Sequence, residues 1–415
     1  MSHTRTLIHE TWGDHEALLA RSSGTNPGSA GPVQIGLIDV ATPGRPLALE
    51  LGGELKQVAV AYETYGELNA KGDNAVLVCH ALTGSAHAAG IHDREEVPGW
   101  WDPLIGPGKA IDTNRFFVIC PNVLGGCYGT TGPVSLDSET GRPYGIDFPR
   151  YTVRDMVHVQ HRLIQALGVK RLTAAIGGSM GGMQVLEWAA CYPEMVRAIV
   201  PIAVGARHSA WAIGLNEVAR RAIMADPAWQ GGHYPVFEQP ETGLGLARAI
   251  AMLSYRSFDS LESKFGRERV AQVAGGPADA QGNGQSNGGS GGGKGDGLQA
   301  LSKSFEIASY LSYQGVKLVQ RFDANTYIHL TLAMDDFDVA DARGPLTEVL
   351  ERLDIPALVM GISSDVLYPE TEQRQLVEAL PNAKYARIIS PHGHDAFLIE
   401  FPQVAARLRR FLNEL

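Results

Sequence analysis

A serine set among glycines is the residue of this chain best suited to act as a nucleophile. Residues 177–181 read Gly-Gly-Ser-Met-Gly and fit G-x-S-x-G, a tight turn that lifts a serine from the end of a strand onto the start of a helix. The motif alone is weak, because the chain has 48 glycines. Its setting is more specific, since an apolar run over 172–176 precedes Ser179 and an amphipathic helical pattern over 184–192 follows it. The alternative is an ordinary strand-to-helix turn in which the serine caps the helix.

A serine nucleophile requires a base, and that base requires a carboxylate to orient it. Where this turn occurs in a covered parallel sheet, the acid and then the histidine follow the serine along the chain. Asp365 comes after an apolar run over 355–361, and His394 comes after one over 385–389. Both residues therefore follow strand ends, as Ser179 does, and we predict that the three form a catalytic triad. An Asx turn is the alternative for Asp365, and His392 is the rival of His394.

The oxyanion of a tetrahedral intermediate requires N–H donors. We predict that one is the backbone N–H of Met180, directly after the nucleophile. The other is expected from the His-Ala-Leu-Thr-Gly loop at 80–84, which follows an apolar run over 75–79. Within that loop the N–H of Leu82 is the candidate.

Apolar runs that alternate with helical patterns predict an α/β fold with a mainly parallel sheet covered on both faces. We expect this core to comprise residues 31–205 and 342–415. Residues 206–341 are helical in pattern and are predicted to form an inserted lid over the carboxyl ends of the strands. Two polar, glycine-rich segments are expected to be poorly ordered: residues 1–30, and a loop over 275–297 within the lid.

The composition excludes several classes of function. A formal net charge of -10 over 415 residues disfavours a nucleic-acid partner. No apolar run reaches the ~18 residues of a membrane span, and the N-terminus lacks the apolar core of a signal peptide. Cys79, Cys120 and Cys191 lie in apolar segments and are predicted to be small core residues. Because neither C-x-x-C nor H-E-x-x-H occurs, we expect no metal site. The lack of a membrane span and of a signal peptide leads us to expect a cytoplasmic protein.

Six segments together resemble a known family. They are HALTG at 80–84, WDPLIGPG at 101–108, NVLGGCYGTTGP at 122–133, GGSMGGMQ at 177–184, RFDANTY at 321–327 and GHDAFL at 393–398. In this order along the chain they resemble the homoserine O-acetyltransferases of the α/β-hydrolase superfamily. Two departures are the glycine-rich segment 275–297 and Ser85, where many relatives carry an acidic residue.

The resemblance implies transfer of acetyl from acetyl-CoA to the hydroxyl of L-homoserine, in methionine biosynthesis. It implies an acyl-serine intermediate, no bound cofactor, and a homodimer that associates through the helical lids. It also implies that Arg248 binds the carboxylate of homoserine and that Asp395 binds its ammonium group. An arginine suits a bidentate contact with a carboxylate.

Other activities would use the same residues. Succinyl transfer would need a further cation for the succinyl carboxylate, and Arg321 is one candidate. The acceptor could be L-serine, one methylene shorter than homoserine. A serine esterase would share the triad but admit water to the acyl-serine. A binding protein without activity would tolerate loss of Ser179, Asp365 or His394, yet all three are present.

Overall fold

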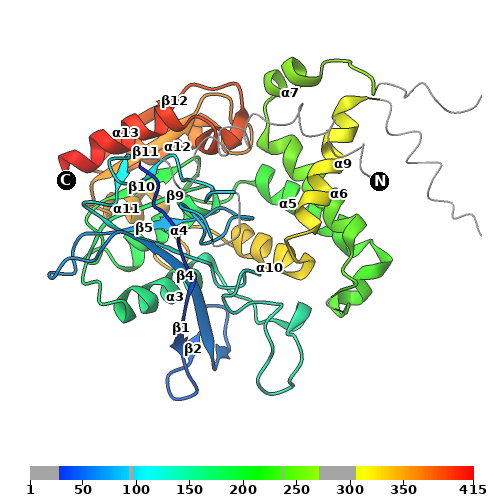
Figure 1. Ribbon diagram of the computed structural model, residues 1–415, viewed down its shortest axis with the longest axis horizontal. Coiled ribbons are helices and arrows are strands. Elements are labelled where there is room, and N and C mark those ends of the chain that lie inside the picture. Colours follow the sequence, from blue (N-terminus) through cyan, green and yellow to red (C-terminus); the bar gives the residue numbers. More distant parts are fainter. Residues whose placement is uncertain (1–27, 93–96, 236, 271–304) are drawn as a thin grey trace, which may run out of the picture.

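The computed structural model describes residues 28–92, 97–235, 237–270 and 305–415. Its core is an eight-stranded sheet in the order β1-β4-β8-β5-β9-β10-β11-β12 (Figure 1). The strands are β1 (Gly36–Ala41), β4 (Val58–Tyr65), β8 (Phe117–Pro121), β5 (Ala75–Cys79), β9 (Leu172–Gly178), β10 (Ile199–Ile202), β11 (Ala357–Ile362) and β12 (Ala383–Ile388). The predicted flexible loop 275–297 and most of the predicted N-terminal segment 1–30 lie outside the described residues.

The sheet is parallel from β8 to β12 and antiparallel at the pairs β1–β4 and β4–β8. This confirms the mainly parallel α/β sheet that the apolar runs predict. Every residue of β5, β9, β10 and β11 is buried. A strand covered on both faces loses the polar alternation of a half-exposed strand, and this is why these segments read as continuous apolar runs.

Two apolar clusters lie on opposite faces of the sheet. Alternate residues of β5 show the division, because Leu77 and Cys79 belong to one cluster and Val76 and Val78 to the other. The first cluster includes helices α3 (Val153–Ala166), α4 (Met180–Cys191), α11 (Leu346–Glu351) and α12 (Glu370–Ala379). The second includes the closing helix α13 (Phe401–Glu414). The core is therefore a three-layer arrangement of helices, sheet and helices.

Helix α4 differs from its predicted character. The pattern over 184–192 predicts an amphipathic helix, but every residue from Met180 to Ala189 is buried. The helix contacts β5, β9 and β10 on one side and α3 on the other. The prediction of an exposed face was therefore wrong, because α3 covers the side that would otherwise meet solvent.

The cysteines also depart in part from prediction. Cys79 and Cys120 are buried core residues, as predicted, whereas Cys191 is only partly buried. Its thiol lies 3.5 Å from a carboxylate oxygen of Glu187 and 3.0 Å from a guanidinium nitrogen of Arg343. Cys191 thus belongs to a polar contact at the end of α4.

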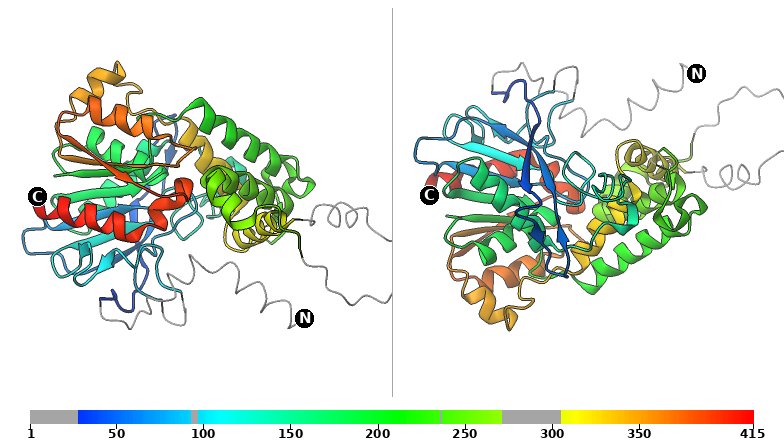
Figure 2. Two further views of the ribbon diagram at one scale, coloured as in Figure 1. Left: turned by 90° about the horizontal axis from the view of Figure 1, so that it is seen from above. Right: turned by 90° about the horizontal axis from the view of Figure 1, so that it is seen from below.

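The segment 206–341, which we call the lid segment, contains helices α5 (Ala210–Met224), α6 (Glu241–Tyr255), α7 (Phe258–Phe265), α9 (Glu306–Val319) and α10 (Ala324–Asp335). These helices gather at one side of the sheet (Figures 1 and 2). Helix α6 packs against both α5 and α9. Gly245 and Gly315 allow that contact, since a Cβ on Gly315 would lie 2.9 Å from the carbonyl oxygen of Gly245.

Shorter elements complete the described chain. Two small sheets pair β2 (Leu47–Ala48) with β3 (Glu54–Leu55), and β6 (Ile105–Gly106) with β7 (Ile111–Asp112). Three 3-10 helices are η1 (Gly145–Asp147), η2 (Pro227–Gly232) and η3 (Gly393–Leu398). Within the described residues, no helix combines the length and the apolar character that a membrane crossing requires.

Candidate active site

Ser179 lies between β9 and α4 in a backbone conformation that few residues adopt. Its φ is 58° and its ψ is −126°. The flanking glycines are required sterically, because a Cβ on Gly181 would lie 2.1 Å from the carbonyl oxygen of Cys79 and one on Gly177 would lie 2.6 Å from Gly181. Strain held by such close packing is typical of functional positions. The local structure is therefore the strand-to-helix turn that the motif predicts.

Asp365 and His394 meet at the carboxyl ends of β11 and β12. Oδ2 of Asp365 lies 2.7 Å from Nδ1 of His394. Its other oxygen, Oδ1, accepts the N–H groups of Leu367 and Tyr368, both at 2.9 Å. The carboxylate therefore forms the turn that the sequence leaves open as an alternative, and it still holds the imidazole.

His394 is buried, and its environment changes its basicity. Burial by itself lowers the pKa of His394, but the charge and hydrogen bond of Asp365, with a contribution from Asp395, outweigh burial and raise the pKa above its ordinary value. Nε2 is buried and has no hydrogen-bond partner among the described residues. The rival His392 instead lies 3.5 Å from the hydroxyl of Ser260. Of the two histidines, only His394 pairs with Asp365.

One cavity of about 850 Å³ brings the nucleophile and the base together. Ser179 and His394 both line it, as do Leu82 and its neighbours in the loop 80–84. Met180 is fully buried behind Ser179, and its N–H is the first of helix α4. Asp365 does not line the cavity and supports His394 from behind. Of the predicted catalytic residues, Ser179, His394 and Leu82 therefore line one cavity, whereas Asp365 and Met180 lie behind its wall.

Arg248 and Asp395 enter the same cavity from α6 and η3. The guanidinium carbon of Arg248 lies 5.6 Å from the centre of the Tyr255 ring. Burial raises the pKa of Tyr255 to about 12, the charge of Arg248 opposes that rise, and the charge of Asp395 adds to it. Both charges are therefore close to one tyrosine, on the lid side of the cavity.

Comparisons with known proteins agree with this geometry. Residues 74–401 match the alpha/beta hydrolase fold family. A homoserine O-acetyltransferase of Carboxydothermus hydrogenoformans is 50% identical over 372 residues, which span 88% of this chain and 93% of the relative. The chain belongs to the homoserine O-acetyltransferase family.

Solved structures place this family beside esterases. The homoserine O-acetyltransferase of Bacillus anthracis is 29% identical, with a TM-score of 0.79, over 92% of this chain and 98% of its own. Esterase E22 has the same identity and TM-score, over 92% of this chain and 100% of its own. Because an esterase and an acetyltransferase are equally similar in fold, the chemistry has to be argued from the cavity.

A buried polar network supports the site, and sequence reasoning did not find it. The amide nitrogen of Gln184 donates to the carbonyl oxygens of His80, at 3.3 Å, and Met180, at 3.1 Å. Gln160 donates in turn to Gln184 at 2.6 Å. The network ties the loop 80–84 to the helix that carries Ser179. A glutamine inside an otherwise apolar run was the available signal.

His80 belongs to this support and does not compete as a base. Its Nε2 accepts the N–H of Val123 at 3.2 Å, and its Nδ1 lies 2.8 Å from the carbonyl oxygen of Ala81. Burial lowers the pKa of His80 to about 4. The ring is therefore neutral near pH 7, and its two hydrogen bonds connect the loop 80–84 to the backbone of Val123.

The charges that line the cavity are mostly positive. Among its described lining residues the cations are Arg248, Arg256, Lys264, Lys317 and Arg321, and the one carboxylate is that of Asp395. Arg321 donates to the carbonyl oxygen of Thr83 at 2.8 Å and to the hydroxyl of Tyr128 at 2.6 Å. The lid segment thus brings a cationic surface to the cavity of a chain whose formal net charge is -10.

Proposed function

We propose that this chain transfers acetyl from acetyl-CoA to the hydroxyl of L-homoserine in two steps, through an acetyl group on Ser179. The observation that carries the proposal is the shared cavity, in which Ser179 and a buried His394 held by Asp365 face the loop of Leu82. Family membership supports the choice of substrates, and the geometry of the cavity supports the roles proposed for the residues.

In the first step His394 acts as the base. Its Nε2 takes the proton of the Ser179 hydroxyl as the serine oxygen attacks the thioester carbon. The N–H groups of Leu82 and Met180 stabilise the negative oxygen of the tetrahedral intermediate. The carbon–sulfur bond then breaks, His394 returns the proton to the departing CoA sulfur, and acetyl-Ser179 remains.

The second step reverses the proton transfers with a different oxygen. Nε2 of His394 takes the proton of the homoserine hydroxyl, and that oxygen attacks the acetyl carbon of acetyl-Ser179. The ester bond to Ser179 breaks, and the serine oxygen regains its proton from His394. Asp365 stabilises the imidazolium that forms in each step and keeps its orientation.

The cationic lining supports an acyl donor that carries phosphates. CoA bears several phosphate charges, and arginine and lysine are the side chains that bind such groups. We assign Arg256, Lys264 and Lys317 to this donor. They line the cavity from the end of α6, from α7 and from α9, respectively. A neutral ester would gain nothing from these charges, which favours a CoA thioester over a simple ester.

Arg248 and Asp395 suit the acceptor. Homoserine is a zwitterion, so its carboxylate requires a cation and its ammonium group requires an anion. The two side chains enter the cavity from different elements beside Tyr255. We propose that Arg248 binds the carboxylate and Asp395 the ammonium group, so that the hydroxyl points toward Ser179.

Two alternatives use the same machinery. Similarity to esterase E22 favours hydrolysis as the second candidate function, with water in place of homoserine. Succinyl transfer would need a cation near the acyl group, and Arg321 lies at the loop 80–84 but is engaged by Thr83 and Tyr128. Those contacts favour a structural role for Arg321, and hence the acetyl donor.

We further propose that the lid segment closes the cavity over the core and carries the contact of a homodimer in the cytoplasm, in methionine biosynthesis. Apolar side chains exposed on its helices support the dimer, notably Trp211, Leu253 and Phe258, which is 77% exposed. Apolar surface of this kind is typical of protein interfaces. The four free cysteines agree with a reducing compartment.

The proposal is tested by mass spectrometry of the intact chain after brief exposure to acetyl-CoA or succinyl-CoA without acceptor. We expect one acetyl group on Ser179, little succinyl, and no acylation of Ser179→Ala. Addition of L-homoserine should discharge the acetyl group as an ester faster than water does. Release of acetate that homoserine does not divert would establish the esterase alternative, and persistent activity of Ser179→Ala would exclude the covalent route.

A further inference from the structure

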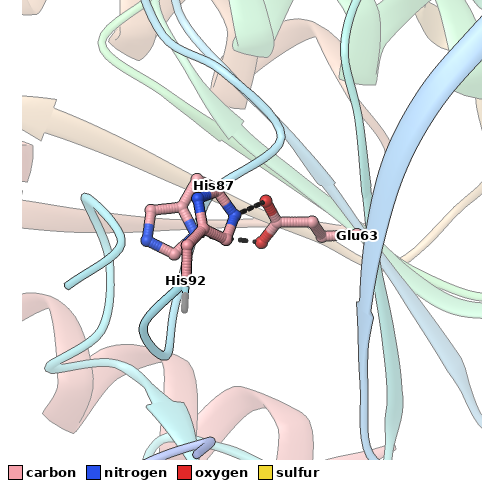
Figure 3. A group of neighbouring side chains, drawn as sticks. All are labelled: Glu63, His87 and His92. Carbon is pink, nitrogen blue, oxygen red and sulfur yellow. Dashed lines mark hydrogen bonds and ion pairs between the residues drawn. The ribbon is translucent and has the colours of Figure 1, made fainter. Parts of the chain in front are cut away.

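A carboxylate on strand β4 meets two imidazoles from a loop that continues from the active-site residues 80–84. Glu63 lies in β4, and His87 and His92 lie in the loop that follows β5 (Figure 3). Nδ1 of His87 is 3.0 Å from Oε2 of Glu63, and Nε2 of His92 is 2.7 Å from Oε1. The two histidine rings pack against each other, with centroids 3.9 Å apart and planes inclined by 32°. Each imidazole therefore directs one nitrogen at a different oxygen of the same carboxylate.

The carboxylate at the centre of this group is fixed in place. The Glu63 side chain is 1% exposed, and its Oε2 accepts the hydroxyl of Tyr65 at 2.8 Å. The Tyr65 oxygen accepts in turn the N–H groups of Ala88 and Ala89. Its one proton has two acceptors within reach, and the Glu63 oxygen at 2.8 Å is nearer than the carbonyl oxygen of Ala86 at 3.2 Å. Tyr65 thus orients Glu63 and anchors the backbone between the two histidines.

We propose that Glu63, His87 and His92 form a binding site for a divalent transition-metal ion such as Zn²⁺. Among the residues that the structure describes, this is the one group of three histidine, cysteine or carboxylate side chains whose ligand atoms all lie within 4.8 Å of one another. Two imidazoles and one carboxylate are a donor set that suits zinc, nickel, cobalt and iron, whereas calcium and magnesium favour oxygen donors.

The distances require only a small adjustment. A tetrahedral zinc ion with bonds of ~2.1 Å holds its donor atoms about 3.4 Å apart. The nitrogen–oxygen separations of 3.0 and 2.7 Å, each to a different oxygen of Glu63, are shorter than this and must widen by less than about 1 Å. The three donor atoms as a set lie within 4.8 Å of one another, so the remaining separations must close by at most about 1.4 Å. The Tyr65 hydroxyl would then be the outer partner that orients the ligating carboxylate, as is usual around bound zinc.

Protons can leave the nitrogens that would bind the ion. In the hydrogen-bonded arrangement, the imidazole nitrogens that face Glu63 donate to its oxygens. A metal ligand must present a lone pair there instead. His87 can supply it by moving its proton to Nε2, which is buried and has no hydrogen-bond partner among the described residues. A proton on Nε2 lacks an acceptor among the described residues, so the metal bonds must outweigh the cost of one buried unsatisfied donor.

The site differs from the proposed catalytic group in both residues and role. His87 also lines the 850 Å³ cavity, which gives an ion and its remaining water ligands a route of entry. A bound ion would join β4 to the loop that continues from the oxyanion residues at 80–84. We therefore assign it a structural role, independent of the acyl transfer proposed above.

The test is zinc binding by the untagged full-length chain after treatment with a chelator. We expect one tightly bound equivalent of Zn²⁺ by calorimetry and by metal analysis after dialysis, with a rise in Tm. His92→Gln should weaken binding at least ~10-fold, and Tyr65→Phe should weaken it by about 10- to 100-fold, as loss of an outer partner does.

A matched control is available in the same chain. His158 lies 3.5 Å from Glu50 and is 27% exposed, against 28% for His92, but among the described residues it belongs to no group of three such ligands. His158→Gln should therefore keep the full affinity. Cobalt adds a second readout, since a Co²⁺ absorption band that His92→Gln abolishes would identify the ligands. Weak binding by the wild-type chain, or equal affinity in His92→Gln, would overturn the proposal and leave a purely hydrogen-bonded cluster.

Discussion

Asp365 holds His394 with one carboxylate oxygen and its own loop with the other. Oδ2 lies 2.7 Å from Nδ1 of the imidazole, and Oδ1 accepts two backbone N–H groups. A carboxylate fixed at both oxygens cannot rotate away, so it fixes the ring that it binds. This leaves Nε2 of His394 as the nitrogen that can exchange a proton with substrate.

We predict that Asp365→Asn lowers kcat by about 10⁴-fold, because the amide favours the wrong tautomer of His394. The base must be neutral, so the rate rises with pH through the pKa of His394, which Asp365 raises. Loss of that charge leaves burial as the dominant effect, and the midpoint of the pH–rate profile should move to lower pH. Profiles of kcat/KM for both proteins check this.

A neighbouring histidine provides the control for that experiment. His392→Gln should retain most of the activity and the pH midpoint of the wild-type chain, because His392 makes no contact with Asp365 among the described residues. An Asp365→Asn midpoint equal to that of the wild-type chain would contradict the assigned base.

The two substrates should be separable by two arginines. We expect Arg248→Ala to raise KM for homoserine by about 10- to 100-fold, the cost of one lost charged hydrogen bond, with little change in KM for acetyl-CoA. Arg256→Ala should instead raise KM for acetyl-CoA, with little change in KM for homoserine. It should leave the hydrolysis of p-nitrophenyl acetate unchanged, because that ester carries no phosphate. Steady-state kinetics with each substrate varied in turn measures both effects. Equal shifts for both substrates in either variant would argue against the assignment.

Packing around the serine turn should make Gly181 intolerant of a methyl group. A Cβ at this position would lie 2.1 Å from the carbonyl oxygen of Cys79, so we expect Gly181→Ala to destabilise the chain by more than ~2 kcal/mol. Gly214, in α5, has no atom within 4 Å of the corresponding position. Gly214→Ala should instead stabilise by up to about 1 kcal/mol. Urea denaturation compares the two, and equal effects would show that the turn can relax.

Glu372 in α12 is expected to lower stability at alkaline pH. Burial and then the charge of Asp365 raise the pKa of Glu372 to about 7, and one of its oxygens is buried without a partner among the described residues. The folded chain therefore binds the proton more tightly than the unfolded chain, so the free energy of unfolding falls as pH rises through the range between the two pKa values.

We predict that Glu372→Gln raises the free energy of unfolding at pH 8 by on the order of 1 kcal/mol, allowing for solvent screening of a partly exposed group. The gain should shrink toward pH 5, where the glutamate is protonated. Glu378 is exposed on the same helix, and Glu378→Gln is the matched control for the removal of one negative charge from α12. Urea-unfolding midpoints of the wild-type chain and of both variants, at pH 5 and at pH 8, measure this difference.

The sequence alone predicted most of the core, because its signals are local. The run 75–79 coincides with β5, and the serine turn follows from glycines within four residues of one another. The order Ser179, Asp365, His394 depends on which residue follows which strand, and parallel strands bring their carboxyl ends to one edge. Chain order was therefore enough to propose the site.

The tertiary structure decided whatever depends on contacts between distant segments. Nothing local distinguishes α4 as buried from Met180 to Ala189, Gln184 as a link to His80, or His87 and His92 as partners of Glu63. The lid cations also read as solvent-exposed charges until the helices fold around the cavity. Periodicity reports which side of one element is apolar, whereas burial, charge density and side-chain contacts arise only when separate elements pack together. The sequence was therefore enough to propose the catalytic residues, whereas the environment of those residues depends on the tertiary structure.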